Sequence, residues 1–291
     1  MVKTKSSYLL ILLMFACAGE QLVSNPPDEN VLLWRGDQMR VVPAALIDRP
    51  ATRPMNLPDI RDIADVDAAA SIVAISAVPS DLQGCKLLLG TLPSGLHEVI
   101  AIPSAVPTLT MSVDGHRIGY SRFAGDPAAY DVYVYDSNVE QPPRLLGSKI
   151  AAPTGSLSFR PTTNELTFED TQGRVSNVDL KTLRVSPVLV GKRPRWSHDG
   201  LRLAFRSEEA VYVYDAARNN STVTYGRSAT DGNFDGSLYW SRNDRFLAFN
   251  LNVGVDAPKR RCVMVDTQTG RVAMAVTTPY LCGPFVSATR E

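Results

Sequence analysis

Three oxygen-bearing side chains, Asp231, Asn233 and Asp235, stand at alternating positions of one polar segment, and Gly236 follows them. Alternating oxygen ligands and a glycine that permits a sharp turn form the first half of a calcium-binding loop. Such a loop needs a bidentate acid at its twelfth position. In this chain that position is occupied by Arg242, which cannot ligate calcium. We therefore predict a polar loop without a metal cofactor, and calcium bound by the three side chains is the alternative.

No motif for catalysis accompanies this loop. The chain has three histidines, His97, His116 and His198, and the latter two fall in or beside short polar turns. The sequence contains no G-x-S-x-G nucleophile motif, no P-loop and no G-x-G-x-x-G motif. We expect solvated turn histidines and assign no catalytic residue, with a histidine-based catalytic pair or metal cluster as the alternative.

Aromatic and basic side chains in two predicted loops are the candidate binding residues. Phe123 and Tyr130 lie in the loop 121–131, and Lys259, Arg260 and Arg261 end the loop 250–261. Long loops on a rigid scaffold often carry binding specificity, and exposed aromatic rings suit a partner or glycan surface. The alternatives are aromatic rings packed between structural repeats and a solvated basic loop.

The four cysteines, Cys17, Cys85, Cys262 and Cys282, match no zinc-binding spacing. Cys262 and Cys282 are twenty positions apart and flank a predicted hairpin, so a disulfide can form between them in an exported protein. Two buried thiols are the alternative. Cys85 is then an unpaired, buried thiol.

Composition restricts the class of protein. The 291 residues include 30 Lys and Arg against 30 Asp and Glu, so the formal net charge is zero, and 44% of the residues are hydrophobic. A neutral chain lacks the excess of basic side chains that nucleic-acid binding requires, so we expect no nucleic-acid partner. The hydrophobic content is sufficient for a folded core.

Internal repeats predict the architecture. Four segments share one pattern, in which a large apolar residue, a polar turn and a closing aromatic residue span ten positions: 111–120, 159–168, 196–205 and 240–249. The sequence VYVYD occurs twice downstream of them, at 132–136 and 211–215. Looser copies of this sequence occur at 175–179 and 262–266. Alternation of apolar and polar residues in these runs predicts half-buried antiparallel strands, and the aligned residues Asp136, Asp179, Asp215 and Asp266 are expected to cap the turns that follow.

Each repeat spans about 40–45 residues and supplies four strands, which is the pattern of a β-propeller blade. At this repeat length, the chain after residue 30 is long enough for about six blades, with roughly five to seven as the range. Residues 66–101 supply an earlier, less regular blade. The N-terminal hairpin of 31–35 and 39–43 and a tail strand at 285–289 are expected to share the blade that closes the ring.

The third repeat resembles the TolB-type, WD40-like propeller repeat, P-x-W-S-P-D-G-x-x-[IL]-[AV]-F-x-S. The matching residues are Trp196, Ser197, Asp199, Gly200, Leu203, Ala204, Phe205 and Ser207. His198 replaces the second proline of the pattern, and the repeat that begins at Trp240 has Asn243-Asp244 where the pattern has Asp-Gly. The resemblance implies a propeller of the kind that binds partner proteins in the bacterial envelope. It is specific for fold and not for function.

The N-terminus has the features of a secretory leader. Lys3 and Lys5 precede the apolar run 8–16, which is too short to span a bilayer, and small residues follow. Cleavage within Ala16-Cys17-Ala18 is one interpretation. The other, which we favour, is a lipoprotein-like signal peptide at 1–17 that resembles a bacterial lipobox, with lipidation of Cys17. Residues 18–30 are predicted as a linker and 31–291 as the propeller domain.

Together these observations predict an all-β propeller that is exported to the periplasm or anchored in the outer membrane through a lipid on Cys17. We expect a monomeric, non-catalytic binding module that engages an envelope protein or a cell-wall component through loops on one face of the ring. The alternative is a glycan- or peptide-active enzyme with its site in the central funnel. That function needs clustered His, Arg and acidic side chains from several inner strands, and the sequence indicates few.

Overall fold

The computed structural model describes residues 29–47, 55–57, 59–69, 71–81, 84–91, 95–106, 108–153, 155–228, 230–253 and 259–286. The predicted leader, Cys17 and most of the predicted linker lie outside the described residues. Across these described ranges, no helix is both long and apolar enough to cross a membrane.

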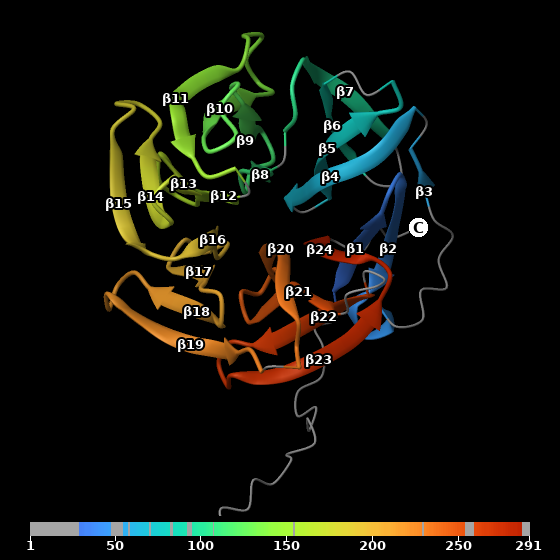
Figure 1. Cartoon of the computed structure of the whole chain (residues 1–291), viewed down its shortest axis with the longest axis vertical. Helices are drawn as coiled ribbons and strands as arrows, with labels where there is room; N and C mark the ends of the chain where they lie inside the picture. Colours follow the sequence, from blue (N-terminus) through green and yellow to red (C-terminus); the bar gives the residue numbers. More distant parts are fainter. Residues whose placement is uncertain are drawn as a thin grey trace, which may run out of the picture.

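Six four-stranded antiparallel sheets surround a central axis, which confirms the predicted six-bladed β-propeller (Figure 1). In each blade the strand given first lies nearest the axis (Figure 1). Blade 1 contains β24 (Leu281–Val286), β1 (Asn30–Arg35), β2 (Gln38–Pro43) and β3 (Met55–Asn56), and blade 2 contains β4 (Ile60–Ala69), β5 (Ile72–Pro79), β6 (Cys85–Thr91) and β7 (Gly95–Ile102). Blade 3 contains β8 (Leu109–Met111), β9 (Arg117–Phe123), β10 (Tyr130–Asp136) and β11 (Arg144–Ala151), and blade 4 contains β12 (Leu157–Arg160), β13 (Glu165–Glu169), β14 (Arg174–Asp179) and β15 (Val185–Val190). Blade 5 contains β16 (Lys192–Trp196), β17 (Arg202–Arg206), β18 (Ala210–Asp215) and β19 (Asn220–Gly226), and blade 6 contains β20 (Asn233–Trp240), β21 (Phe246–Val253), β22 (Lys259–Asp266) and β23 (Arg271–Thr278).

The tryptophans of the repeat pattern join neighbouring blades. Trp196 is buried at the end of β16, and its Nε1 donates to Oγ1 of Thr167 in blade 4 at 2.7 Å. Trp240 ends β20 in the same way, and its Nε1 donates to the carbonyl oxygen of Arg195 in blade 5 at 2.9 Å. Each indole therefore buries its ring between blades while its single donor is satisfied, as a buried Trp requires.

Blade 1 is built from both ends of the described chain, as predicted. β24 pairs antiparallel with β1, with Trp34 opposite Leu281 and Leu33 opposite Cys282. The side-chain amide of Asn250 on β21 also donates to the carbonyl of Cys282 at 2.8 Å and accepts from its N–H at 2.9 Å. The closing strand begins earlier than the predicted 285–289, because Leu281 and Cys282 already pair with β1.

The structure places a disulfide between Cys262 on β22 and Cys282 on β24, with Cα atoms 5.7 Å apart. The bond joins blade 6 to blade 1 and does not flank a single hairpin. Cys85 is a buried free thiol, and its Sγ lies 3.1 Å from the hydroxyl of Ser76.

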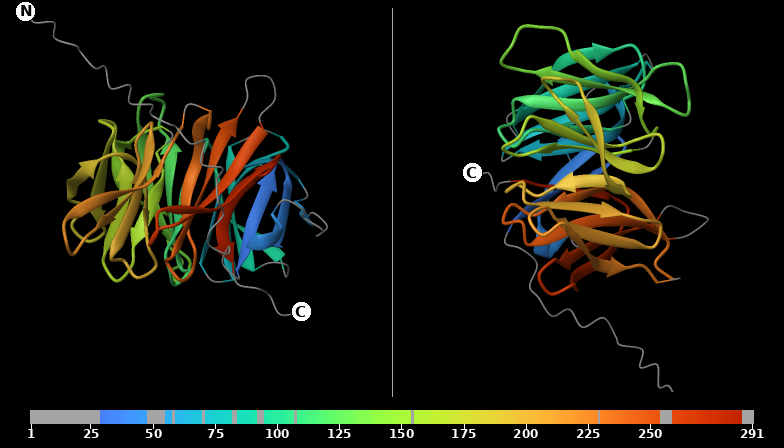
Figure 2. Two further views of the ribbon diagram at one scale, coloured as in Figure 1. Left: turned by 90° about the horizontal axis from the view of Figure 1, so that it is seen from below. Right: turned by 90° about the vertical axis from the view of Figure 1, so that its left-hand side faces the viewer.

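Successive strands of a blade run in opposite directions, so the connections fall on two faces (Figure 2). We call the face with the connections from first to second and from third to fourth strands the turn face. The opposite face, with the second-to-third connections and the links between blades, is the long-loop face. On the turn face, the Asp that ends each third strand of blades 3 to 6 accepts a hydrogen bond from the N–H two residues later at 2.9–3.0 Å, which confirms the predicted capping role of Asp136, Asp179, Asp215 and Asp266.

Blade 2 shows the main difference from the predicted strands. The sequence indicated an irregular blade over 66–101, but its inner strand β4 begins at Ile60. Asp62, Asp65 and Asp67 disfavour a strand by propensity. The structure offsets this preference, because Asp65 and Asp67 accept hydrogen bonds from the backbone of β8 in the next blade.

Candidate functional site

The predicted aromatic binding residues contact each other. Phe123 ends β9 and Tyr130 begins β10, and the two are directly paired across the strands. Their rings meet edge to face with centroids 5.7 Å apart, and Phe123 remains 36% exposed. The strands extend further than predicted, so the connecting segments are only 124–129 in blade 3 and 254–258 in blade 6; the latter lies outside the described residues.

The predicted basic cluster and the predicted calcium ligands form one arrangement in blade 6. Arg260 Nε lies 3.1 Å from Asp235 Oδ2, and Arg261 Nη1 lies 3.0 Å from Asp231 Oδ1. Asn233 Oδ1 accepts from Arg227 at 3.4 Å. Guanidinium groups thus contact the oxygens that calcium would use, and no three His, Cys, Asp or Glu side chains of the described part could jointly hold a metal ion.

These two groups of predicted binding residues do not form one surface. Lys259, Arg260 and Arg261 belong to blade 6, whereas Phe123 and Tyr130 belong to blade 3, on the opposite side of the ring (Figure 1). Both groups lie toward the long-loop face, since they flank connections between second and third strands.

Polar side chains from four blades converge instead on the central channel. The inner strands β4 and β16 supply two charged residues each, Asp65 and Asp67 and then Arg193 and Arg195. Asp65 and Asp67 are two residues apart in a regularly paired part of β4, so they point to the same face, whereas the pairing of β16 is irregular between Lys192 and Arg195. β20 adds the buried Tyr239.

An ion pair spans the middle of this channel. Arg195 Nη1 donates to Asp67 Oδ2 at 2.7 Å, and its Nη2 contacts Asp67 Oδ1. Thr110 Oγ1 and the N–H of Met111 also donate to Asp67 Oδ2, at 3.0 and 2.7 Å. Burial lowers the pKa of the Arg195 guanidinium, but the charge of Asp67 and its hydrogen bonds have a larger effect, so the pKa is raised. The pair connects blades 2, 3 and 5 across the axis.

A pocket of about 180 Å³ lies at the long-loop end of the channel, and we call it the long-loop pocket. Its lining includes Trp34, Asp65, Thr108, Arg193, Ser237 and Tyr239. Asp65 is 7% exposed. Burial, reinforced by the charge of Asp67, raises the pKa of Asp65 to about 7, although the N–H of Leu109 opposes this shift.

Two further groups of the long-loop pocket lack full partners. Arg193 sits at an irregularity in the β16–β17 pairing with φ of +54°, a strained conformation for a residue with a side chain. Its guanidinium contacts Ser156 Oγ at 3.4 Å, and none of the described carboxylates forms an ion pair with it. Trp34 is 3% exposed, and no described group accepts a hydrogen bond from its Nε1.

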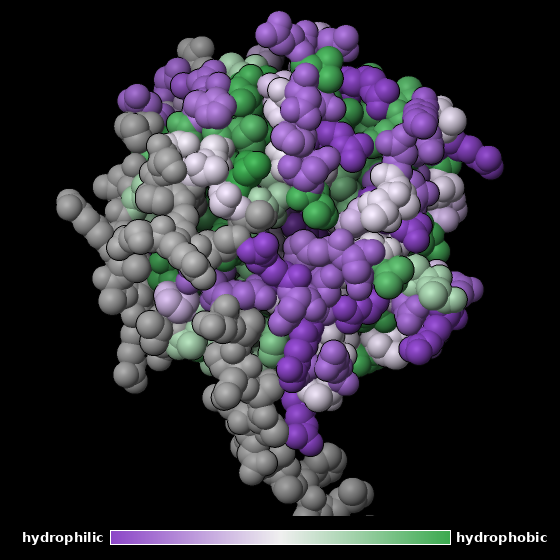
Figure 3. Space-filling model, turned by 180° about the vertical axis from the view of Figure 1, so that it is seen from behind, coloured by the Kyte–Doolittle hydropathy of each residue, from purple (hydrophilic) through white to green (hydrophobic). Residues whose placement is uncertain are grey.

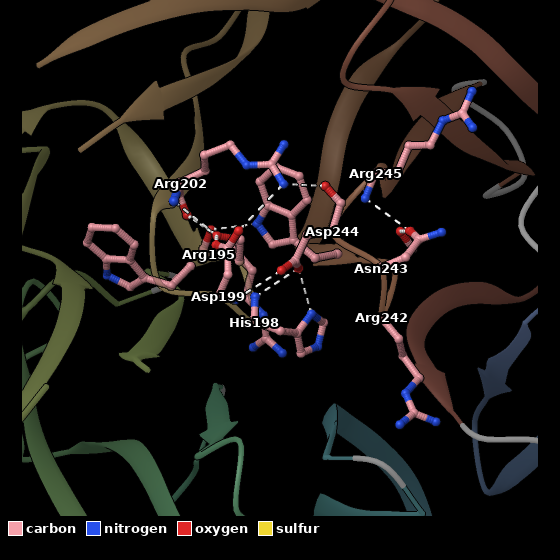
Figure 4. Close-up of polar contacts among 12 residues, drawn as sticks. Arg195, His198, Asp199, Arg202, Arg242, Asn243, Asp244 and Arg245 are labelled. Carbon is pink, nitrogen blue, oxygen red and sulfur yellow. Dashed lines mark hydrogen bonds and ion pairs between the residues drawn. The ribbon is translucent and has the colours of Figure 1, made fainter. Parts of the chain in front are cut away.

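A second pocket, of about 200 Å³, lies at the turn-face end and is called the turn pocket. Its lining includes Phe159, Arg195, His198, Arg242 and Phe285. Figure 4 shows His198 directed at Asp244 of the neighbouring blade, with Nδ1 2.7 Å from Oδ1. Asp244 also accepts from the N–H groups of His198 and Asp199, at 2.8 and 2.9 Å.

His198 and Asp244 are the positions where two repeats depart from the TolB-type pattern. His198 replaces a proline, which has no N–H to donate, and Asp244 takes the place of a glycine with φ of +55°. Burial raises the pKa of Asp244, but its hydrogen bonds and the charge of His198 outweigh that and lower it. The departures compensate each other as one contact between blades 5 and 6.

The sequence therefore failed to reveal the charged channel. The prediction of few acidic and arginine side chains in the funnel is wrong, because Asp65, Asp67, Arg193 and Arg195 all line it. A signal existed for the acidic pair, because the pattern Asp-x-Asp places both carboxylates on one face of a strand. Among the described residues, no histidine side chain forms a hydrogen bond with a Ser, Thr or Cys.

Comparison with known proteins identifies the fold. Neither a family model nor a curated protein matches the sequence. Among solved structures, the chain is similar to TolB from Acinetobacter baumannii at a TM-score of 0.65 and 13% identity, covering 90% of this chain and 69% of that one. It is also similar to putative TolB from Agrobacterium tumefaciens (0.61; 14% identity; 90% and 95% covered) and to a chain of a nidogen/laminin complex (0.67; 9% identity; 88% and 97% covered). At these identities the likeness shows the fold alone: a propeller of the TolB type.

Proposed function

We propose that the chain is an exported, non-catalytic binding module of the bacterial cell envelope. It engages an envelope protein or a cell-wall component through its long-loop face, and it acts as a monomer. The observation that carries the proposal is the long-loop pocket, where Asp65 and Arg193 form no ion pair and retain hydrogen-bonding capacity that a ligand can use. Buried polar groups are ordinarily hydrogen-bonded.

Exposed apolar side chains near the long-loop face support a macromolecular partner. Val190 at the end of β15 is 81% exposed, and Phe123 is 36% exposed. The turn face also exposes single apolar residues, such as Leu201. Figure 3 views this turn face and shows the hydrophobic residues in small separate groups among hydrophilic ones.

Export rests on the predicted leader and on the resemblance to TolB-type propellers. Lipidation of Cys17 places the protein on a membrane, most simply the outer one, with the propeller in the periplasm. Labelling with palmitate tests this directly. The wild-type chain should incorporate label and Cys17→Ala should not; an unlabelled wild-type chain contradicts lipidation of Cys17.

Capture from an envelope extract tests the binding proposal. The double variant Phe123→Ser with Val190→Ser alters the long-loop face, and Leu201→Ser is the control on the turn face. A specific partner captured by the wild type and the control, but lost with the double variant, supports the proposal. Equal capture by all three chains, or no specific capture, contradicts use of this face.

A second candidate function is an enzyme acting on glycans or peptides in the channel. The observation that favours it is the raised pKa of Asp65, about 7, because a carboxyl that titrates near neutral pH can serve as general acid or base. Turnover of a polysaccharide or peptide substrate that disappears in Asp65→Asn would establish this function in place of binding.

A further inference from the structure

Asp65 and Arg193, which are opposite in charge, line the long-loop pocket without forming an ion pair, although the charge of Arg193 lowers the pKa of Asp65 somewhat. Asp65 comes from β4 and Arg193 from β16, and neither forms an ion pair with a described residue. Proteins ordinarily pair the charges that they bury. In the middle of the same channel, Asp67 and Arg195 satisfy each other fully. The unpaired groups thus mark positions for two ligand charges of opposite sign.

The carboxyl group of Asp65 retains acceptor capacity. Its Oδ2 accepts from the N–H of Leu109 and its Oδ1 from the N–H of Val66, both at 3.0 Å. A carboxylate offers about four acceptor positions, so about two remain after these bonds. The adjacent Asp67 adds negative potential. A ligand ammonium group would find both hydrogen-bond acceptors and a favourable field here.

The donors at the other charge position suit an anion. A guanidinium carries about five N–H donors, and that of Arg193 makes one hydrogen bond to a described residue, to Ser156 Oγ at 3.4 Å. A carboxylate is planar and accepts from several donors at once, so it matches a guanidinium.

We infer that the long-loop pocket binds a small zwitterion of amino-acid size, whose ammonium group contacts Asp65 and whose carboxylate contacts Arg193. The volume of about 180 Å³ is below the roughly 300–1,000 Å³ of pockets for larger ligands. The hydroxyl groups of Thr108, Ser237 and Tyr239 complete a polar lining. This inference rests on the proposed function, since it names the ligand chemistry of the same pocket.

Isothermal titration calorimetry on the purified chain tests the inference with free α-amino acids of both configurations as probes. The tightest probe is then compared with its N-acetyl and carboxamide derivatives. In the wild type each derivative should bind about 10- to 100-fold more weakly, which is the usual loss for a hydrogen bond to a charged group. In Asp65→Asn the N-acetyl penalty should vanish, and in Arg193→Gln the carboxamide penalty should vanish.

Lys192→Gln is the matched control, because Lys192 neighbours Arg193 but pairs with Glu208 at the surface; it should bind like the wild type. Equal binding of the free and blocked probes, or no binding of any amino acid, overturns the inference. If a variant fails to fold, the derivative comparison on the unaltered chain decides. Capture of an envelope partner, measured separately, then still decides the proposed function.

Discussion

The two ends of the central channel differ in how their charges are satisfied. At the turn pocket, Arg195 is held by Asp67, and His198 by Asp244 of the next blade. At the long-loop pocket, Asp65 and Arg193 share a lining without an ion pair, and the indole of Trp34 has no acceptor. The same kinds of side chain therefore serve two purposes in one channel.

This difference separates structural polar groups from groups available to a ligand. Paired groups bridge blades that are far apart in sequence, so they hold the ring together. Unpaired groups cost stability, because desolvation is not offset by a partner, and such sites are typical of binding or catalysis. The comparison predicts that changes at paired groups lower stability, whereas changes at unpaired groups alter pH dependence or binding.

The largest effect is expected for Asp67→Ala. The change leaves Arg195 buried without its partner, and breaking one side of a buried pair typically costs about 3–5 kcal/mol. Denaturant unfolding followed by tryptophan fluorescence measures the loss. The double variant Asp67→Leu with Arg195→Met is the control, since it removes both charges and should lose much less. Equal losses would show that the pair is not what holds blades 2 and 5.

A smaller effect is expected at Asp65, and it concerns the pH dependence of stability rather than the loss of an ion pair. Burial and the charge of Asp67 raise the pKa of Asp65 from 3.8 to about 7, so the folded chain holds this proton more tightly than the unfolded chain. The stabilisation is complete below about pH 4 and is lost as the pH rises through about 7. The free energy of unfolding should fall by on the order of 1 kcal/mol per pH unit between about pH 5 and 7, relative to Asp65→Asn.

That difference is measured by unfolding both chains over the same pH series. The other charged groups that face Asp65 are Asp67, Arg193, Arg195 and the hydroxyl of Tyr239, and they are unchanged in the variant. Parallel pH profiles for the two chains would show that Asp65 titrates normally, and the contrast between the two pockets would lose its electrostatic basis.

At the turn pocket, Asp244→Gly should cost about 1–2 kcal/mol, because the N–H groups of His198 and Asp199 lose their acceptor. His198→Pro restores the other repeat position. If the two residues act as one contact, the double variant should be more stable than the sum of the single changes implies, by about 0.5–3 kcal/mol in a double-mutant cycle. Strict additivity would mean that the two departures are independent.

The smallest effect is expected at the rim of blade 6. Arg260→Gln removes the ion pair with Asp235. The side chain of Arg260 is 25% exposed and that of Asp235 is 34% exposed, and such partly exposed pairs contribute about 0–1 kcal/mol. Addition of millimolar calcium should not change the melting temperature of the wild type, since arginines contact these carboxylates. A calcium-dependent rise in the melting temperature would restore the metal site that the sequence pattern suggested.

The repeats made the fold predictable, because the pattern of Trp196 and Trp240 reflects contacts that every blade needs. The closing blade could also be predicted, since a ring must satisfy its own edge strands. The charged channel was not, because it depends on which residues of distant strands face one axis. Asp65 lies outside the blade predicted over 66–101, and Asp has a low strand propensity. The N–H groups of Leu109 and Met111, about 44 positions away, accommodate Asp65 and Asp67 in a strand.

The participation of β24 in blade 1 has a consequence for the order of events in the cell. The ribosome makes β1 first and β24 last, so the buried residues Leu32 and Leu33 of β1 have no inner neighbour until residues 281–286 have been made. Premature termination before Leu281 would leave five blades and an open edge. Until β24 is made, the edge of β1 that pairs with it stays open, and proteases and chaperones can bind there.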